Sequence, residues 1–341
     1  MSEQARFAAV VADIDVATDE PRLLAALDSA RRTAVAALGA HTPALTLADG
    51  WSQVMMHALA AATRLATIEA IPWTWFVSGS VGRREAIPGS DIETLIALDD
   101  DVGPDTKSTA MVLAADVHAM LERCGLSGDA NGVLASRGRF CRRRSSWSQG
   151  IERWCADPAR DRGVVMTGLT SDSAAVVDRS DWLRAQALAA TRRHPQALRA
   201  MLQDGTAFRA GIPSRLRVFA THADTVDIKQ AAVEPIVKIA RWAAMSAGSD
   251  SVFTLERLDH AGTAGTLDAD DAATLRECYA AASHIRWRRR ARAWIDGRPV
   301  TDLISLTAMS PQERATLRAI GREVNGIRRK LAFLASTPSF R

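Results

Sequence analysis

Cysteine and tyrosine are scarce in this sequence of 341 residues, which contains four cysteines and a single tyrosine. No two cysteines form a C-x-x-C pair, and their spacing matches no zinc-binding pattern. A chain of this length can bury a core without disulfide bonds, so we expect free, buried thiols. The scarcity of tyrosine and the abundance of alanine favour helical structure over an all-β fold.

The sequence also lacks an apolar run of the length, about 20 residues, that crosses a bilayer. Its first residues, Met-Ser-Glu-Gln-Ala-Arg, show no basic region followed by an apolar core. We therefore expect no secretory leader, no membrane partner and a cytoplasmic location. None of the seven histidines stands at a motif spacing from a serine or cysteine, which gives no support to hydrolase-type nucleophilic catalysis.

Positive charge is concentrated in two segments, although the formal net charge is only +4. Segment 137–144 contains five arginines, which could clamp a triphosphate or an acidic partner, or could form a solvated loop. Segment 286–292 could bind RNA through stacking on Trp287, but a solvated helix face is the favoured interpretation. The small net charge makes nucleic acid an unlikely partner of the whole chain.

The most informative stretch of the sequence joins two predicted strands through a turn of small residues. The apolar residues 73–77 predict the first strand, and residues 92–98 predict the second. Gly79 and Ser80 predict a turn, because a larger side chain there would block the close approach of a phosphate. A short helix after the turn would direct its free backbone N–H groups at that phosphate.

Two carboxylates, Asp91 and Glu93, stand at the start of the second predicted strand. Because they are two residues apart, they point to the same side of a strand. Such a pair suits a divalent cation such as Mg²⁺ or Mn²⁺, which prefers oxygen ligands. A phosphate turn beside a carboxylate pair predicts metal-assisted phosphoryl or nucleotidyl transfer, which depends on positioning and charge neutralisation.

These residues form a pattern that resembles a known family. Gly-Ser-x-Gly-Arg-x-Glu begins at Gly79, and Ser-Asp-x-Glu begins at Ser90. The combined string looks like that of the DNA polymerase β-type nucleotidyltransferase superfamily. Within it, the sequence resembles the signal-transduction nucleotidyltransferases that often carry CBS domains, and is related to the protein-PII uridylyltransferases. The strings Asp-Ile-Lys, Pro-Ile-Val-x-x-Ala-Arg and Thr-x-x-Arg-Leu, beginning at 227, 235 and 254, look like the C-terminal helical domain of these proteins.

The resemblance implies an α+β fold, in which a small mixed β-sheet core is flanked by an N-terminal helical segment and a C-terminal helical bundle. We expect the helical segment at 1–70, the nucleotidyltransferase-like domain at 71–180 and the C-terminal helical domain at 181–341. Apolar residues at helical spacing agree with this division. They include Leu23, Leu27, Ala30, Ala34 and Ala37 near the start, and Leu317, Ile320, Val324, Ile327, Leu331 and Leu334 near the end.

The resemblance also implies roles for particular residues. Gly79 and Ser80 would hold the triphosphate of the NTP substrate, with Arg83 as a second nucleotide contact. Asp91 and Glu93 would bind Mg²⁺ or Mn²⁺ as catalytic residues.

Lys229, in the Asp-Ile-Lys string, would contact the nucleotide from the C-terminal domain, although a surface or ion-paired lysine is the commoner case.

A third carboxylate is the point at which the sequence departs from the resembled family. Relatives carry it on a further strand, which we expect at 163–169, and the alignment places Thr167 at that position. Asp172 is the nearest acid and is therefore predicted as the third catalytic residue. Glu93 is a second departure, because the resembled proteins have Asp there.

The predicted function is transfer of a nucleoside monophosphate from an NTP to an acceptor hydroxyl. The resemblance implies that the acceptor or regulatory partner is a protein and that the role is in signal transduction. The two departures support an alternative, a catalytically degenerate relative that binds nucleotide or a partner and regulates without chemistry.

Overall fold

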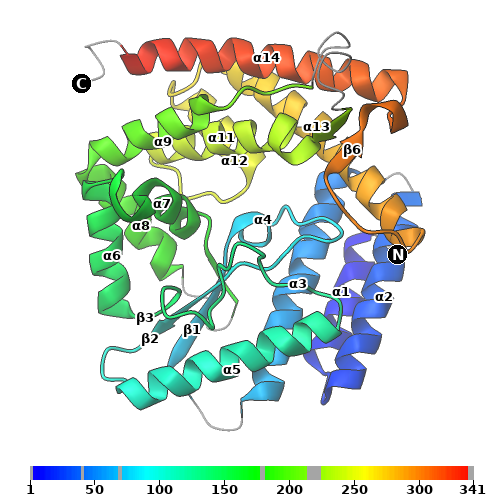
Figure 1. Ribbon diagram of the computed structural model, residues 1–341, viewed down its shortest axis with the longest axis vertical. Coiled ribbons are helices and arrows are strands. Elements are labelled where there is room, and N and C mark those ends of the chain that lie inside the picture. The colour runs from blue at the N-terminus through cyan, green and yellow to red at the C-terminus, as the bar shows by residue number, and fades with distance from the viewer. Residues whose placement is uncertain (1–2, 40–41, 68–70, 177–180, 213–223, 337–341) are drawn as a thin grey trace. The chain divides into compact units, whose positions relative to one another are not determined.

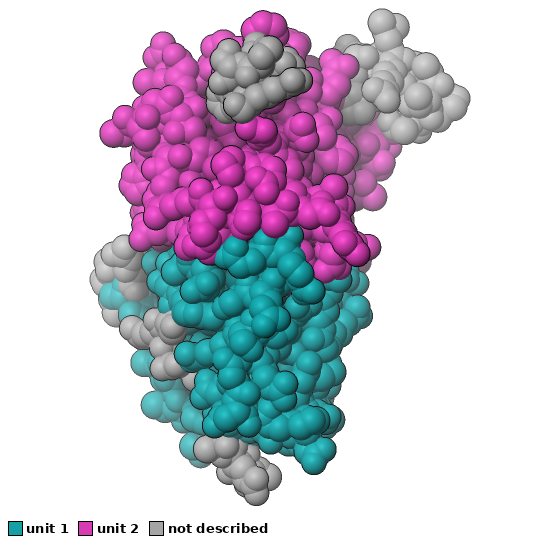
Figure 2. All heavy atoms as spheres, turned by 90° about the vertical axis from the view of Figure 1, so that its left-hand side faces the viewer, with its two compact units in different colours: residues 1–153, 169–187 teal, residues 154–168, 188–341 magenta. Residues whose placement is uncertain are grey.

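The structure is a computed structural model that describes residues 3–39, 42–67, 71–176, 181–212 and 224–336. Helices dominate it, together with a small mixed sheet, so the predicted α+β class is confirmed. The chain divides into two compact units, which Figure 2 colours separately. Unit 1 comprises residues 1–153 and 169–187, and unit 2 comprises residues 154–168 and 188–341.

Three helices that pack against one another begin unit 1 (Figure 1): α1 (Glu3–Asp15), α2 (Glu20–Gly39) and α3 (Ala44–Ala66). The stripe predicted for α2 is buried throughout, which confirms that it is a packing surface: Leu23, Leu27, Ala30, Ala34 and Ala37.

A four-stranded sheet forms the rest of the core of unit 1. Its strands are β1 (Trp73–Val77), β2 (Thr94–Leu98), β3 (Cys141–Arg143) and β4 (Ala174–Ala175), in the order β3–β2–β1–β4. β1 pairs antiparallel with both β2 and β4, and β2 pairs parallel with β3. β2 is buried along its whole length, and β1 is buried after its first residue, which explains why both read as apolar runs.

Helices connect and cover these strands. They are α4 (Gly79–Gly82), α5 (Pro104–Arg123) and α6 (Arg144–Ala156). The first strand lies as predicted, whereas the second begins at Thr94 rather than at Ile92. Ile92 instead forms an isolated parallel bridge with Gly128.

The boundary between the units falls within α6 and within two further helices. They are α7 (Gly163–Ser171), preceded by the short helix η1 (Arg160–Arg162), and α8 (Trp182–Arg193). His194-Pro195 separates α8 from the next helix, because proline disfavours a helical conformation in the residue before it.

Unit 2 continues as a helical bundle with a two-stranded sheet. Its helices are α9 (Pro195–Ala207), α11 (Glu234–Ser246), α12 (Thr254–Thr263), α13 (Ala269–Ile295) and α14 (Pro311–Ser336). The strands β5 (Thr225–Asp227) and β6 (Leu303–Ser305) pair antiparallel. Two short helical turns complete it, the π-helical η2 (Lys229–Val233) and η3 (Leu306–Ala308).

The last helix, α14, carries the predicted amphipathic stripe and packs against α9 and α13. Five residues of the stripe are buried: Leu317, Ile320, Val324, Ile327 and Leu331. Leu334, the sixth, is 44% exposed near the end of the helix.

The cysteines agree with the expectation from composition. All four cysteines are free and buried, as predicted: Cys124, Cys141, Cys155 and Cys278. Burial raises the pKa of Cys141 and of Cys278 to about 11. In the part of the chain that the structure describes, no helix combines the length and apolar character needed to cross a membrane.

Candidate functional site

The turn after β1 holds two predicted site residues, Gly79 and Ser80. Gly79 has a φ of +58°, a left-handed conformation that favours glycine. A Cβ atom on Gly79 would also lie 2.8 Å from the carboxylate of Glu93. Both the turn and the close approach of Glu93 therefore require a glycine here. Ser80 follows in the one-turn helix α4 and is partly exposed.

Asp91 and Glu93 lie on one side of the chain just before β2. Ile92 between them is completely buried, whereas both acids are partly exposed, which is the alternation expected of extended backbone. The carbonyl of Glu93 accepts a hydrogen bond from the backbone N–H of Ser78 at 3.1 Å. This bond ties the acidic segment directly to the turn after β1.

The pKa of Glu93 is raised from its ordinary value to about 7. Burial is the main cause, and the positive charge of Arg83 opposes it. Three neighbouring negative charges raise this pKa further: Asp91, Asp129 and Asp172. The surroundings of Glu93 therefore favour a bound proton or a bound cation.

Arg83 is buried and binds two carboxylates. Its Nε donates to Glu85 at 2.9 Å, and its Nη1 donates to Asp172 at 2.6 Å. The three residues are 7%, 8% and 1% exposed, in that order. The Arg83 guanidinium is therefore the counter-ion of two buried acids, and its direct contact with a nucleotide stays a prediction.

Asp172 reaches the site because the strand after it pairs with β1. The register places Ala174 opposite Val77, so Asp172 comes beside the turn that follows β1. A Cβ atom on Gly82 would lie 2.2 Å from the carbonyl oxygen of Asp172. The close packing of these two segments explains the second glycine of the motif.

The strand predicted at 163–169 is wrong, because these residues belong to α7. A short apolar run fits a buried helix as well as a buried strand, and periodicity alone does not separate them. A tight turn with positive φ at Asp161 and Arg162 precedes the helix. Thr167 is buried inside this helix, so it does not occupy the strand position at which a third carboxylate was expected.

Asp129 is a buried acid of the site that sequence reasoning missed. It is 4% exposed, and its carboxylate accepts hydrogen bonds from Asn131 Nδ2 at 3.1 Å and from the Val133 backbone N–H at 2.8 Å. The bridge between Ile92 and Gly128 brings it to the acidic segment. No local motif signals this position, because the pairing joins distant parts of the chain.

The second half of the arginine-rich segment 137–144 forms β3 and the start of α6, whereas residues 137–140 lie in turns and Arg137 is exposed. Arg143 donates two hydrogen bonds to the Val102 carbonyl, at 2.9 and 2.6 Å. Arg144 forms an ion pair with Asp99 at 3.3 Å. These two arginines hold the end of β2 and the segment after it, which gives them structural roles.

Comparison with protein families gives two matches. Residues 28–161 match the family described as "Putative nucleotidyltransferase DUF294". Residues 195–334 match the family described as "Putative nucleotidyltransferase substrate binding domain". Both matches support a nucleotidyltransferase family. A comparison with curated proteins gives no match.

Lys229 lies within the segment that matches the nucleotidyltransferase substrate-binding domain. It is exposed at the start of η2 and lines a pocket of unit 2. Its charge is one of those that lower the pKa of Asp302, against the effect of burial. The position of Lys229 in a pocket is compatible with the predicted nucleotide contact, which stays a prediction.

The second arginine-rich segment, 286–292, lies within α13 and is engaged in ion pairs. Arg286 donates to Asp302 through Nε at 2.8 Å and Nη2 at 2.7 Å, and Arg289 binds Glu313. Trp287 is completely buried. The hypothesis that Trp287 stacks on an RNA base is therefore wrong, since its ring is not accessible.

Asp91 and Glu93 are the residues that would hold the metal ion of a nucleotidyltransferase. Among the described residues, no group of three or more acidic, histidine or cysteine side chains is placed to hold a metal. Mg²⁺ is commonly bound to proteins by one or two carboxylates, with waters and substrate phosphates completing its shell. The carboxylates of Asp91 and Glu93 fit this mode of binding, because the surroundings that raise the pKa of Glu93 also favour a bound cation.

Proposed function

We propose that the chain is a metal-dependent nucleotidyltransferase that moves a nucleoside monophosphate from an NTP to an acceptor hydroxyl. The observation that carries the proposal is the position of the Glu93 carboxylate against the glycine turn, 2.8 Å from the place of a Cβ atom on Gly79, with three further carboxylates near enough to raise its pKa. Such an accumulation of negative charge is unfavourable unless a proton or a cation compensates it. A divalent cation that arrives with the triphosphate would supply this compensation.

In this proposal, each site residue of unit 1 has its own role in the transfer. Gly79 and Ser80 allow the triphosphate to approach the turn, and Asp91 and Glu93 hold Mg²⁺ or Mn²⁺. The metal supplies positive charge that neutralises the phosphates. The acceptor oxygen forms a bond to the α-phosphorus, the bond to pyrophosphate breaks, and the hydroxyl proton passes to a carboxylate. Asp172 is the predicted proton acceptor.

The acceptor in this proposal is a protein hydroxyl, and the transfer regulates that protein. This part rests on the resemblance of the sequence to signal-transduction nucleotidyltransferases and to the protein-PII uridylyltransferases. The family described for residues 195–334 supports a substrate-binding region in the chain.

A regulator without transferase activity is the second candidate function. It is favoured by Thr167, which is buried in α7 and supplies no third carboxylate. The ion pair between Arg83 and Asp172 also favours it, because that carboxylate is already neutralised. In this case the protein binds nucleotide or a partner but transfers nothing.

Transfer of label tests the two candidates directly. The purified chain is incubated with each of the four α-labelled NTPs, Mg²⁺ or Mn²⁺, and a lysate of its own source. We expect a labelled protein band with the wild type and none with the Asp91→Asn/Glu93→Gln variant.

An Asp101→Asn/Asp105→Asn variant is the matched control, because both acids are exposed and lie after β2. It removes the same charge and should label the band normally. If the wild type binds nucleotide but labels no protein with either metal, the chain is a regulator without transferase activity.

A further inference from the structure

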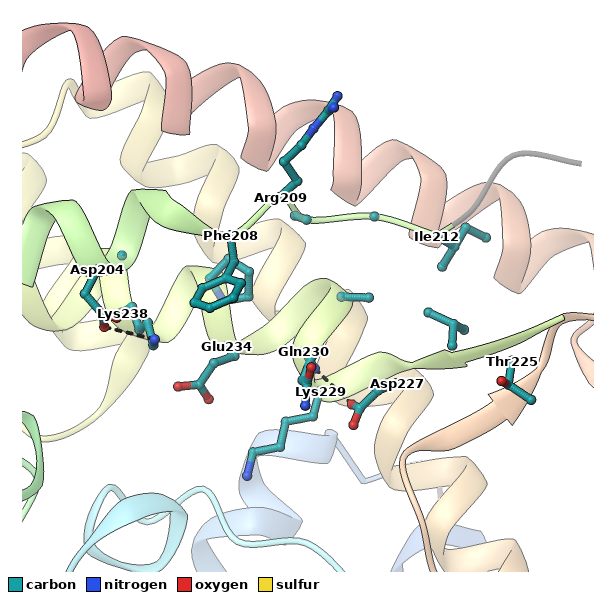
Figure 3. A pocket seen from close by; sticks show the side chains of 16 residues that line it. Asp204, Phe208, Arg209, Ile212, Thr225, Asp227, Lys229, Gln230, Glu234 and Lys238 are labelled. Atoms are coloured by element: carbon teal, nitrogen blue, oxygen red, sulfur yellow. Dashed lines mark hydrogen bonds and ion pairs between the residues drawn. The ribbon is translucent and has the colours of Figure 1, made fainter. Parts of the chain in front are cut away.

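A pocket of about 1030 Å³ in unit 2 is not explained by the residues of the transfer reaction in unit 1. It lies between the end of α9, the π-helical turn η2 and the start of α11, as Figure 3 shows. Its volume is at the upper end of the range found for small-molecule sites, roughly 300–1,000 Å³. π-Helical turns occur frequently at functional sites.

The wall formed by residues 208–211 is fixed by hydrogen bonds on two sides. Pro235 has no N–H to donate to the Ala231 carbonyl, which instead accepts from the backbone N–H of Gly211 at 2.7 Å. Asn325 on α14 bonds to both backbone groups of Ala210, accepting at 3.1 Å and donating at 2.6 Å. The chain at Phe208 is therefore held from η2 and from α14.

Phe208 presents an aromatic ring to this pocket and is 64% exposed. The Lys238 ammonium lies 5.2 Å from the ring centroid and forms an ion pair with Asp204 at 2.9 Å. The Lys238–Asp204 ion pair lies on one side of the Phe208 ring. In Figure 3, Gln230 and Lys229 lie toward the other side of this ring. A large exposed apolar ring held in this way is available for stacking.

Arg209 also lines the pocket, but in Figure 3 its side chain extends in the direction opposite to that of Lys229. Two other charged side chains of the pocket are available to a ligand, namely Lys229 and Glu234. Neither forms a side-chain hydrogen bond or an ion pair with another residue of the described ranges. The other two carboxylates are engaged, since Asp204 binds Lys238 and Asp227 accepts from the Gln230 backbone N–H at 3.0 Å. In Figure 3 the side chains of Lys229 and Glu234 extend in the same direction from η2 and α11.

We infer that this pocket binds a nucleoside monophosphate, with the base on Phe208, the phosphate on Lys229 and the ribose hydroxyls on Glu234. An aromatic ring stacks on any base, because every base has a π-face. An ammonium attracts a phosphate, and a carboxylate accepts hydrogen bonds from hydroxyl groups. The inference does not depend on metal binding at Asp91 and Glu93.

Calorimetric titration of the full chain with AMP tests the inference. The Asp91→Asn/Glu93→Gln variant is used with EDTA, so that the predicted metal site of unit 1 cannot contribute. We expect saturable binding of AMP that is weakened roughly tenfold or more by Phe208→Leu and by Lys229→Gln in this background.

Fragments of the ligand separate the two contacts. Binding of adenosine should be weakened by Phe208→Leu but not by Lys229→Gln. Binding of inorganic phosphate should be weakened by Lys229→Gln but not by Phe208→Leu. Phe333→Leu is the matched control, because Phe333 on α14 is also largely exposed, at 68%. Circular dichroism melting curves establish that each variant is folded.

Two results would overturn the inference. One is the absence of AMP binding to the folded chain, and the other is AMP binding that survives both Phe208→Leu and Lys229→Gln. Neither result bears on the labelling experiment, which tests the transfer reaction through Asp91 and Glu93.

Discussion

The guanidinium of Arg83 and the carboxylate of Asp172 meet at 2.6 Å, and both side chains are buried in unit 1. Arg83→Met keeps an unbranched apolar stem, shorter than arginine, and leaves Asp172 and Glu85 without their counter-ion. Removal of one partner from a buried ion pair typically costs about 3–5 kcal/mol. We expect a loss of this size in the free energy of unfolding, measured by urea denaturation.

The control for this prediction is Arg123→Met, which breaks the exposed pair with Glu20. Water screens such a pair, so we expect a much smaller loss. Equal losses in the two variants would show that the Arg83 pair has no special structural role.

Gly82→Ala should destabilise the protein because a Cβ atom there lies 2.2 Å from the carbonyl oxygen of Asp172. A backbone oxygen cannot rotate away, so the two segments must separate. Overpacking of this kind typically costs about 1–3 kcal/mol. Urea denaturation measures the loss.

Gly326→Ala in α14 is its control, since no atom lies within 4 Å of the added Cβ. Alanine is also the better helix former, so we expect this variant to be no less stable than the wild type. A Gly82→Ala protein as stable as the Gly326→Ala protein would contradict the packing argument.

The raised pKa of Glu93 makes the metal-free protein less stable as the pH rises from about 4.5 to 7. In this interval the folded state keeps a proton on Glu93 that the unfolded chain has released. The full effect is about 3 kcal/mol at one pKa unit per 1.36 kcal/mol. In EDTA, Glu93→Gln should therefore be the more stable protein at pH 7.5, by an amount that vanishes towards pH 4.5.

Urea denaturation of the wild type and Glu93→Gln at a series of pH values measures this difference. A stability difference that does not change with pH would mean that Glu93 titrates normally in the folded protein.

His118 should have the opposite effect, because burial lowers its pKa from 6.5 to about 4. Its Nε2 lies 2.8 Å from the hydroxyl of Thr94, which already accepts from the Ala135 backbone N–H. Burial of the ring disfavours the charged imidazolium, so the folded state favours the neutral imidazole. Stability should fall as the pH decreases from 6.5 to 4, by about 3 kcal/mol.

His118→Gln, which keeps a neutral acceptor, should remove this dependence. Because the contributions of Glu93 and His118 oppose each other, the wild-type stability should vary less between pH 4.5 and 6.5 than that of either variant. Parallel curves for the wild type and His118→Gln would contradict the assignment.

The parts of the fold that the sequence predicted are those with a strong local signal. The strand at 73–77 and the stripes of α2 and α14 follow from apolar periodicity. The turn was predicted from the small residues Gly79 and Ser80, and the positive φ of Gly79 shows why a glycine is needed there.

The parts that the sequence did not predict depend on long-range pairing. The apolar run at 163–169 was predicted to be a strand, but it forms part of α7. Such a run does not show whether it pairs with another strand or packs as a buried helix. The strand that follows this segment, β4, has two residues, which are too few to give an apolar pattern in the sequence. Asp129 joins the site through a bridge to Ile92 that no local spacing encodes.

The burial of all four thiols has a practical consequence for experiments on this protein. A thiol whose pKa is near 11, as for Cys141 and Cys278, is almost wholly protonated at neutral pH and reacts slowly with maleimides. Since Cys124 and Cys155 are also buried, a single cysteine introduced at an exposed position can be labelled in the otherwise natural sequence. Spectroscopic probes can thus be attached without first replacing the native cysteines.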